Sequence, residues 1–361
     1  MIIGLNYDFK KYTERFNSSD FSSFVLGVDT GGTNTNLGVA GIKERSLELL
    51  FSLKFKTKEL DSLIPAVTHT LNYVKDNFDI KIQNACIGAA GVVSRLQDYV
   101  KLTNADWDVN TNELIEETTL NSAFIINDFE AIGYGVNLLD IKNTEDIFTV
   151  RSVDKGNIGK TKAIIGAGTG LGKSILVYNQ QSKTYIPIPC EGGHADFPVR
   201  DDFELDLINF IKKFRNISQP ITYEELLSGR GLESIYMFLK QSGKYEESQY
   251  SNEIISSIDK AEAISKYKES DDLCAETFRL FTRFYGRCAK NFVLDSLAIG
   301  GLYIAGGISL KNKEIFSTDT FISEFENVYR YSKYLKEIPI YVILNYDISL
   351  KGACFAALYK R

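Results

Sequence analysis

The sequence has few cysteines, prolines and histidines: 5, 6 and 2 in 361 residues. Its cysteines lie far apart, odd in number, and no two of them form a CxxC pair; they are Cys86, Cys190, Cys274, Cys288 and Cys354. This spacing argues against a disulfide framework and against a structural zinc site. We therefore expect a protein of a reducing compartment.

A long hydrophobic run is also missing. The longest uncharged stretch, Ser296–Leu310, has 15 residues and contains four glycines, whereas a membrane-spanning helix needs about 20 apolar residues. The first residues reach Asp8, Lys10 and Lys11 early without an apolar run, which is not the pattern of a secretory signal. We expect a cytoplasmic protein with no membrane partner.

The sequence also lacks an excess of basic residues. Lys and Arg total 41, Asp and Glu total 47, and the formal charge is −6. This balance argues against a general nucleic-acid-binding surface. The hydrophobic content of 44% and charged content of 24% are ordinary for a folded globular protein. The length predicts about two domains of ~150 residues.

Apolar patterning predicts alternating strands and helices. Short apolar runs predict strands at Phe24–Val28, Thr35–Ile42, Leu49–Phe55, Asn84–Ala90, Phe124–Ile126, Ala163–Ile165, Ser174–Tyr178, Leu302–Ala305 and Ile338–Leu344. Helical spacing predicts helices at Ser62–Lys75, Asp201–Phe214, Gly231–Gln241, Asp271–Leu297 and Gly352–Tyr359. The alternation indicates an α/β class. The polar stretch Asp140–Lys162 is predicted to connect the first domain to a second one. Residues 1–22 are predicted to form a peripheral extension.

Three glycine-rich segments follow predicted strands: DTGGTN (Asp29–Asn34), GAGTGLG (Gly166–Gly172) and IAGGI (Ile304–Ile308). Glycine lacks a Cβ, so its backbone N–H group can approach an anion closely. Each segment alone could be a tight turn, but three of them favour phosphate binding. Most of the 27 glycines lie in these and the other motif segments, which predicts that glycine is placed mainly for ligand contact.

Side chains in these segments suit a nucleotide. The hydroxyls of Thr33 and Thr169 can donate to phosphate oxygens, and Asp29 can hold Mg²⁺ through water, since Mg²⁺ usually keeps part of its hydration shell.

A P-loop is an alternative for the second segment. Ala167–Ser174 has the sequence AGTGLGKS, close to the P-loop pattern. Its first position is alanine, and the SILVYNQQ that follows Lys173 is typical of a strand, whereas a P-loop needs a helix there. The P-loop alternative predicts that Lys173→Ala abolishes turnover, and the strand interpretation predicts that most activity survives.

Several segments together resemble bacterial-type glucokinase. LGVDTGGTN, LTNADW, INDFEAIGYG, GAGTGLG, EGGHADF, LSGRGLESIY and YIAGGIS stand in the order and rough spacing of that family, from about Phe24 to Tyr359. DxGGT alone is shared by the wider hexokinase, actin and Hsp70 group, whereas EGGHADF with INDFEA is more specific. The related ROK sugar kinases and repressors carry a cysteine-rich zinc motif that is absent here. Arg230 replaces a common proline, and Lys351 a common glycine.

The resemblance implies a two-domain actin-like ATPase (ribonuclease H-like) α/β fold with a cleft between a small and a larger domain. The small domain would comprise residues 1–138 and 347–361, so that the last helix returns to it, and the larger domain residues 139–346. ATP and Mg²⁺ would be the cofactors and glucose the partner, phosphorylated on its 6-hydroxyl. A homodimer is common among such enzymes.

The resemblance also implies roles for single residues. Asp128 would be the general base, although an aspartate there also suits a helix N-cap, as does Asn127. His194 would bind sugar instead of serving as a core histidine, and Glu225 is the alternative to Glu224. The implied sugar-binding residues are Asn104, Asn127, Asp128, Glu191, His194 and Glu224. The implied nucleotide-binding residues are Asp29, Thr30, Gly31, Gly32, Thr33, Asn34, Gly168, Thr169, Gly170, Gly306 and Gly307. No direct metal ligand is assigned.

Other functions would require other sequence features. A kinase of another hexose or amino sugar is the nearest alternative. A sugar-sensing repressor would need a DNA-binding module, for which the 22 preceding residues are too few. An actin-like ATPase that binds no sugar has no reason to carry EGGHADF.

Overall fold

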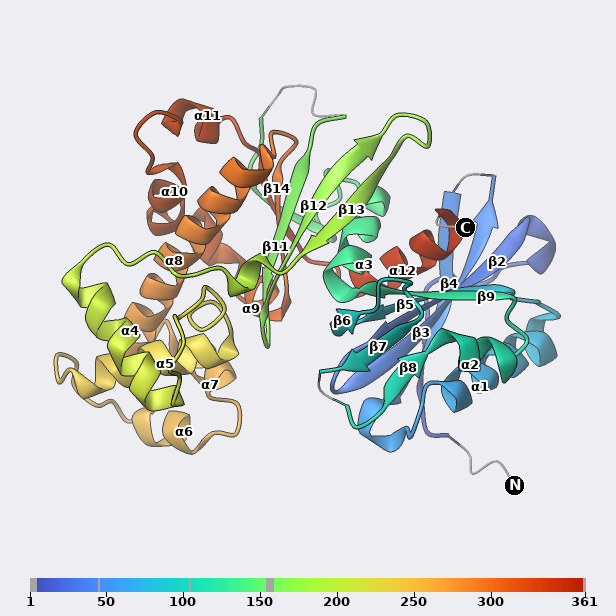
Figure 1. Ribbon diagram of the computed structural model, residues 1–361, viewed down its shortest axis with the longest axis horizontal. Coiled ribbons are helices and arrows are strands. Elements are labelled where there is room, and N and C mark those ends of the chain that lie inside the picture. Colours follow the sequence, from blue (N-terminus) through green and yellow to red (C-terminus); the bar gives the residue numbers. More distant parts are fainter. Residues whose placement is uncertain (1–4, 45, 104, 154–158, 360–361) are drawn as a thin grey trace. The chain divides into compact units, whose positions relative to one another are not determined.

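The computed structural model describes residues 5–44, 46–103, 105–153 and 159–359 (Figure 1). The chain forms two compact units, which are described separately. The first comprises Met1–Leu139, Gln181–Pro189 and Asn345–Arg361, and the second Asp140–Gln180 and Cys190–Leu344.

The segment Gln181–Pro189 was not expected in the first unit. Its Tyr185 backbone N–H donates to Asn137 Oδ1 at 2.7 Å, and Asn137 Nδ2 donates to the Tyr185 carbonyl at 2.9 Å. The two residues are 48 positions apart, so the sequence gives no local signal of this contact.

The first unit contains a six-stranded sheet with the order β1-β4-β3-β2-β5-β9. Its strands are β1 (Asp8–Lys11), β2 (Ser23–Thr30), β3 (Asn34–Lys43), β4 (Ser46–Lys56), β5 (Asn84–Ala89) and β9 (Ser122–Asn127). The predicted hairpin is confirmed, because β2 and β3 pair antiparallel around the DTGGTN turn. Strands β2, β5 and β9 run parallel.

The two faces of this sheet are covered by different helices (Figure 1). On one face, helix α1 (Ile64–Phe78) contributes Val67 and Leu71 to a core with Leu26. On the other, helix α12 (Ile348–Tyr359) contributes Ala353 to a core with Val25. Because successive strand residues point to opposite faces, β2 feeds both cores.

Short elements complete the first unit. Strands β6 (Gly91–Val93), β7 (Tyr99–Leu102) and β8 (Asp108–Asn110) form a three-stranded sheet. Helices α2 (Thr111–Glu116) and α3 (Asp128–Gly135) flank β9, with 3₁₀ turns at Ser18–Asp20, Thr57–Glu59 and Val136–Leu138. Strands β6, β7 and β8 were not predicted, because these short segments contain no uninterrupted apolar run of four residues.

The described part of residues 1–22, predicted as a peripheral extension of the small domain, includes an exposed strand at the edge of the first unit's sheet. Strand β1 pairs antiparallel with β4 and covers the edge of the sheet, where unpaired backbone groups would otherwise be exposed. Phe9 and Phe16 stack on Phe51, and Lys10 Nζ lies 2.6 Å from Asp347 Oδ2. Aromatic side chains therefore make this segment part of the first unit.

Glycines allow α12 to pack in direct contact with its neighbours. A Cβ on Gly352 would lie 1.8 Å from the Ala131 carbonyl oxygen of α3, and one on Gly27 2.6 Å from the Cys354 backbone nitrogen of α12. Contacts under 3.0 Å do not occur for real Cβ atoms, so only glycine fits. At these two positions glycine serves helix packing.

The second unit is built on a sheet with the order β10-β15-β14-β11-β12-β13. The strands of this sheet are β10 (Ile147–Arg151), β11 (Lys162–Ala167), β12 (Leu171–Asn179), β13 (Thr184–Cys190), β14 (Leu302–Ala305) and β15 (Ile340–Ile343). All of β13 except Cys190 is grouped with the first unit. The predicted strands are confirmed, and β10 lies inside the stretch predicted as a polar passage. Strand β12 follows the GAGTGLG turn directly, so the helix that a P-loop requires is absent and that alternative is wrong.

The three long helices predicted in this half are confirmed as α4 (Asp202–Arg215), α5 (Gly229–Gln241) and α8 (Asp272–Ser296). Shorter ones are α6 (Ser251–Ser256), α7 (Lys260–Tyr267), α9 (Gly307–Lys311), α10 (Asp319–Glu326) and α11 (Ser332–Lys336), with 3₁₀ turns at Gly192–His194 and Lys313–Ser317. Helix α8 packs against α5 and α10, and its Phe281 and Tyr285 are fully buried.

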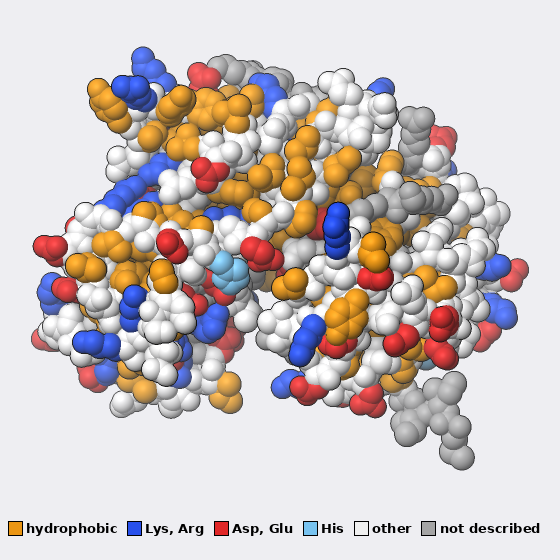
Figure 2. All heavy atoms as spheres, in the orientation of Figure 1, with side chains coloured by type: hydrophobic (Ala, Val, Ile, Leu, Met, Phe, Trp, Pro, Cys, Tyr) orange, Lys and Arg blue, Asp and Glu red, His pale blue; other side chains and the backbone are white. Residues whose placement is uncertain are grey.

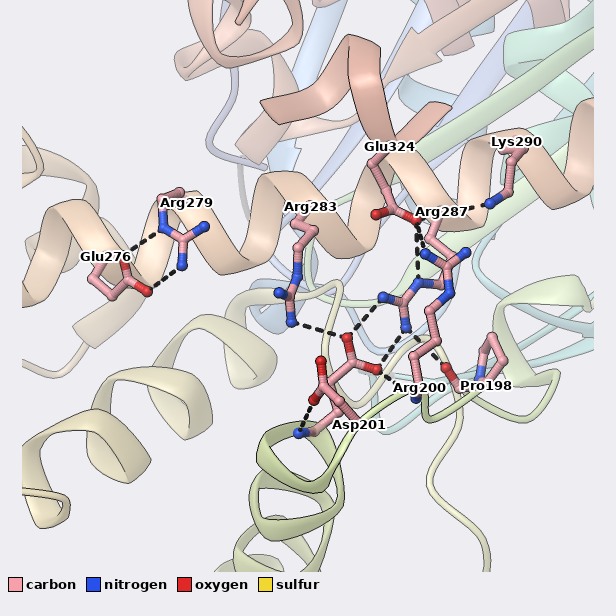
Figure 3. Close-up of polar contacts among 10 residues, drawn as sticks. Pro198, Arg200, Asp201, Glu276, Arg279, Arg283, Arg287, Lys290 and Glu324 are labelled. Atoms are coloured by element: carbon pink, nitrogen blue, oxygen red, sulfur yellow. Dashed lines mark hydrogen bonds and ion pairs between the residues drawn. The ribbon is translucent and has the colours of Figure 1, made fainter. Parts of the chain in front are cut away.

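Buried charges join α8 to α4 and α10. The Arg287 guanidinium donates to both carboxylate oxygens of Glu204 at 2.7 and 2.8 Å, and Arg283 donates to one of them at 2.9 Å. Glu324 of α10 accepts from Arg200 and Arg287. Figure 3 shows Arg283 and Arg287 reaching from one side of α8 toward the start of α4. The side chains of Arg287 and Glu204 are only 2% and 1% exposed.

Charged side chains of both signs are mixed on the face shown in Figure 2, without a continuous basic stripe. Among the helices that the structure describes, none combines the length and the apolar character needed to cross a bilayer.

Candidate active site

In the first unit, a chain of hydroxyl groups holds the turn between β2 and β3. Thr30 Oγ1 and Thr35 Oγ1 lie 3.1 Å apart, and Thr35 Oγ1 and Thr57 Oγ1 lie 3.0 Å apart. Thr57 Oγ1 then donates to the Gly31 carbonyl at 2.7 Å. The Thr30 side chain is therefore buried inside this support, whereas Thr33 at the tip of the turn is exposed.

Asp29 lies one residue before this support. Its Oδ1 accepts a hydrogen bond from Ser349 Oγ of α12 at 2.9 Å. Burial raises the pKa of the Asp29 carboxyl, and the bond from Ser349 opposes that shift. Helix α12 thus fixes the orientation of the acidic residue next to the turn.

Asn127 and Asp128 lie where β9 ends and α3 begins. Asn127 is the N-cap, and its Oδ1 accepts from the Phe129 backbone N–H at 2.8 Å. Asp128 is the first helical residue, and its Oδ1 accepts from the same N–H group at 2.9 Å. The positive end of the helix dipole stabilises a negative charge at this place. Of the two capping candidates predicted from the sequence, Asn127 is confirmed.

In the second unit, Gly168–Gly170 form the tight turn between β11 and β12. The Gly168 N–H donates to the Gly170 carbonyl at 2.8 Å, and the Gly168 carbonyl accepts from the Gly229 N–H at 3.0 Å. Around Gly168 nothing lies within 4 Å of an added Cβ, whereas on Gly170 such a Cβ would lie 2.6 Å from Glu224 Oε2. One side of this turn is open and the other rests on Glu224.

Glu224 contacts three segments of the second unit. Its Oε2 accepts from the Leu171 N–H at 2.9 Å, and its own backbone N–H donates to the Gly193 carbonyl at 3.0 Å. Its Oε1 lies 3.1 Å from Arg230 Nη2. The side chain predicted to bind sugar therefore also supports the glycine turn and pairs with Arg230.

Glu191 is the N-cap of a single 3₁₀ turn, Gly192–His194, and His194 is its last residue. Their side chains are 73% and 59% exposed, and Glu191 Oε2 lies 3.9 Å from His194 Nε2. His194 is therefore not a core histidine. An added Cβ on Gly193 would lie 2.0 Å from the Leu171 carbonyl oxygen, so the turn is pressed against β12.

Lys173 lies beneath this turn. Its side chain is buried, and its Nζ donates to the Gly192 carbonyl at 2.9 Å. The ammonium group also lies 5.1 Å from the centre of the Tyr223 ring and 5.2 Å from that of Phe292, within the range of cation–π attraction. Sequence reasoning considered Lys173 only as a P-loop lysine; the residue instead holds the turn that carries Glu191 and His194.

A cavity of about 680 Å³ opens beside the glycine turn of the second unit. Of the predicted nucleotide-binding residues, Gly168, Thr169 and Gly307 line it. Gly306 has φ +89°, and a Cβ there would lie 2.4 Å from the Ala167 carbonyl oxygen, so its place is explained by backbone packing.

Sequence reasoning missed most of the cavity wall. The wall includes three cations, Arg230, Lys260 and Lys311, and the apolar Leu232, Ile258 and Ile308. These residues come from α5, α7, α9 and the segment before α7, which no local motif connects.

Asn104, which was predicted to bind sugar, lies outside the described residues.

Comparison with known proteins decides the family. The glucokinase family model matches residues 26–360. The chain belongs to the glucokinase family. A glucokinase of Trichormus variabilis is 34% identical over 349 residues, covering 93% of this chain and 99% of that relative.

Solved glucokinase structures share the fold. One from an Antarctic psychrotroph has a TM-score of 0.76 at 23% identity, covering 93% of this chain and 99% of that one. The glucokinase of Balamuthia mandrillaris in complex with glucose has a TM-score of 0.76 at 23% identity, with 93% and 94% covered. The two-domain actin-like ATPase fold expected from the sequence is thereby confirmed.

Proposed function

We propose that this member of the glucokinase family transfers the γ-phosphoryl group of ATP to the 6-hydroxyl of D-glucose. The observation that carries the proposal is the similarity to glucokinases over 93% of the chain, together with a family match whose range, residues 26–360, spans both INDFEA and EGGHADF. The cavity beside Gly168 and Thr169 agrees with it, since 300–1,000 Å³ is the usual range for small-molecule sites.

Asp128 is the general base in this proposal. A kinase must bring a hydroxyl in line with the γ-phosphate and take up its proton. Asp128 offers a carboxylate at the N-terminus of α3, and its bond from the Phe129 N–H fixes one oxygen. The neighbouring Asn127 is fixed by the same N–H group, so both side chains are oriented before substrate arrives.

Glu191, His194 and Glu224 bind sugar hydroxyls together with Asn127, and Asn104 is assigned to the same set. Each supplies a polar group that a missing or inverted hydroxyl would leave unpaired, which is how polar sites discriminate among sugars. The exposed side chains of Glu191 and His194 on one short turn suit this role.

The nucleotide is held by backbone groups as well as by side chains. Gly168, Thr169, Gly170 and Gly307 would meet it from the second unit. The residues assigned to the nucleotide in the first unit are Asp29, Thr30, Gly31, Gly32, Thr33 and Asn34. Of these, Thr30 acts indirectly, because its hydroxyl supports the turn. Gly306 acts in the same indirect way, by packing at the end of β14.

Mg²⁺ enters with ATP and neutralises phosphate charge. Asp29 fits an outer contact to it through water, because its carboxylate is held in place by Ser349 and Mg²⁺ usually keeps several waters.

Lys173→Met should raise the KM for glucose about tenfold and leave the KM for ATP and the kcat at saturating glucose nearly unchanged. The substitution keeps an apolar stem but removes the charged donor to the Gly192 carbonyl, which then keeps only the longer bond from the Ala195 N–H at 3.4 Å. A hydrogen bond to a charged group contributes about 1.5–3 kcal/mol. Steady-state kinetics with each substrate varied would measure this, with the exposed Lys213→Met of α4 as control. A fall in kcat at unchanged glucose KM would contradict this role.

The proposed function is tested by identifying the product. Purified protein with glucose and ATP should form glucose 6-phosphate, detected as NADP reduction by added glucose-6-phosphate dehydrogenase. ADP formation without that signal would place the phosphoryl group elsewhere and contradict the proposal.

A further inference from the structure

Arg230 is one of three cations in the wall of the cavity. It is the second residue of α5, its side chain is 55% exposed, and it lines the cavity together with Lys260 and Lys311. A cavity that takes a nucleoside triphosphate needs donors for phosphate oxygens. The planar guanidinium of arginine presents several N–H groups that match such oxygens in pairs.

The ion pairs of these cations differ. Lys260 pairs with Glu233 at 3.3 Å, and Lys311 with Glu262 at 2.8 Å; both glutamates lie in the cavity wall. Arg230 pairs with Glu224 at 3.1 Å. Among the described cations of the cavity wall, Arg230 is the one that pairs with a member of the proposed sugar-binding set, and its Nη2 also lies 4.0 Å from Glu225 Oε1.

Glu224 connects that pair to the sugar-binding turn. Its backbone N–H bonds the Gly193 carbonyl, and its Oε2 stays on the Leu171 N–H. These two bonds keep the residue in place whether or not Arg230 is present. The Arg230 bond therefore controls one thing, the availability of Glu224 Oε1.

Resting on the proposed function, we propose that Arg230 couples nucleotide binding to sugar binding through Glu224. In the free enzyme the guanidinium occupies Glu224 Oε1. A bound nucleoside triphosphate offers several anionic oxygens and draws the guanidinium to itself. Glu224 Oε1 then accepts a sugar hydroxyl, and glucose binds more tightly when the nucleotide is present. By thermodynamic linkage, glucose raises nucleotide affinity by the same factor.

The exchange needs only a local movement. The Arg230 side chain is 55% exposed and that of Glu224 15% exposed, so the pair contributes less to stability than a fully buried one. Glu224 keeps its bond from the Leu171 N–H when Arg230 leaves.

Calorimetric titration of glucose tests the coupling, with and without Mg²⁺ and a non-hydrolysable β,γ-imido ATP analogue. In the wild-type protein the analogue should lower the Kd for glucose about fivefold or more, the lower end of typical couplings. In Arg230→Gln, glucose should bind the nucleotide-free protein about as tightly as it binds the wild-type complex. The ratio of the two Kd values should then be close to one.

Lys311→Gln is the matched control. It removes another cavity cation, whose partner Glu262 lies outside the sugar-binding set, so it should weaken binding of the analogue and leave the coupling ratio at the wild-type value. Arg230→Lys keeps the charge without the paired donors and should give an intermediate ratio. Thermal unfolding of each variant confirms that it is folded.

A wild-type ratio of one would overturn the coupling, and so would the same ratio in Arg230→Gln as in the wild type. Reversing the titration gives an internal check, because the analogue must show the same ratio with and without glucose. If the wild-type protein bound no glucose under any condition, the proposed function itself would fail, which distinguishes the two claims.

Discussion

Asp128→Asn should lower kcat by about 10²–10⁴-fold, the range that general acid–base catalysis contributes, while the protein stays folded. Asparagine can still accept the hydrogen bond that Asp128 Oδ1 takes from the Phe129 N–H, so the start of α3 is preserved. What is lost is a group that can take the proton of the sugar hydroxyl. Substrate binding should change much less than turnover.

Asp202→Asn provides the control for this prediction. Asp202 is the first residue of α4, as Asp128 is of α3, but it is exposed and outside the proposed site. Its replacement should leave kcat within about twofold. Both variants would be compared by steady-state kinetics and thermal unfolding. A near wild-type kcat for Asp128→Asn would remove Asp128 from the role of base.

Glu204→Gln should destabilise the protein by about 3–5 kcal/mol, because removing one partner of a buried ion pair leaves the other charge uncompensated. Glu204 accepts from Arg283 and twice from Arg287. For a unit of about 200 residues, this predicts a fall in Tm of about 6–20 °C, at roughly 2–4 °C per kcal/mol. Thermal unfolding followed by circular dichroism would measure it.

Glu276→Gln on α8 is the matched control. Glu276 pairs with Arg279 three residues along α8, with the arginine half exposed (Figure 3). Such a pair contributes about 0–1 kcal/mol, so the Tm should change by no more than a few degrees. An equal change in Tm for the two substitutions would contradict the claim that burial makes the Glu204 ion pairs important for stability.

Local patterns in the sequence predict the main strands of both units. The apolar runs around DTGGTN and GAGTGLG predict β2, β3, β11 and β12, because two-residue alternation and glycine turns act over short distances. The position of Asn127 before an apolar helix predicts its capping role for the same reason.

Contacts between distant residues could not be predicted. Glu224 meets the Leu171 N–H across 53 positions, and Arg287 meets Glu204 across 83. Gly352 is required by the carbonyl of Ala131, a partner that becomes visible only when α12 lies against α3. Lys173 resembled a phosphate-binding lysine by spacing, yet burial of its side chain under Gly192 gives it a different task.

The central claim is phosphorylation of glucose by this chain, and a panel of hexoses with ATP tests it most directly. ADP production would be followed in a coupled assay with glucose, mannose, N-acetylmannosamine and other hexoses at equal concentrations. We predict that ADP production depends on glucose and that kcat/KM is highest for it. An absence of glucose-dependent ADP production, with or without activity on another sugar, would contradict the account.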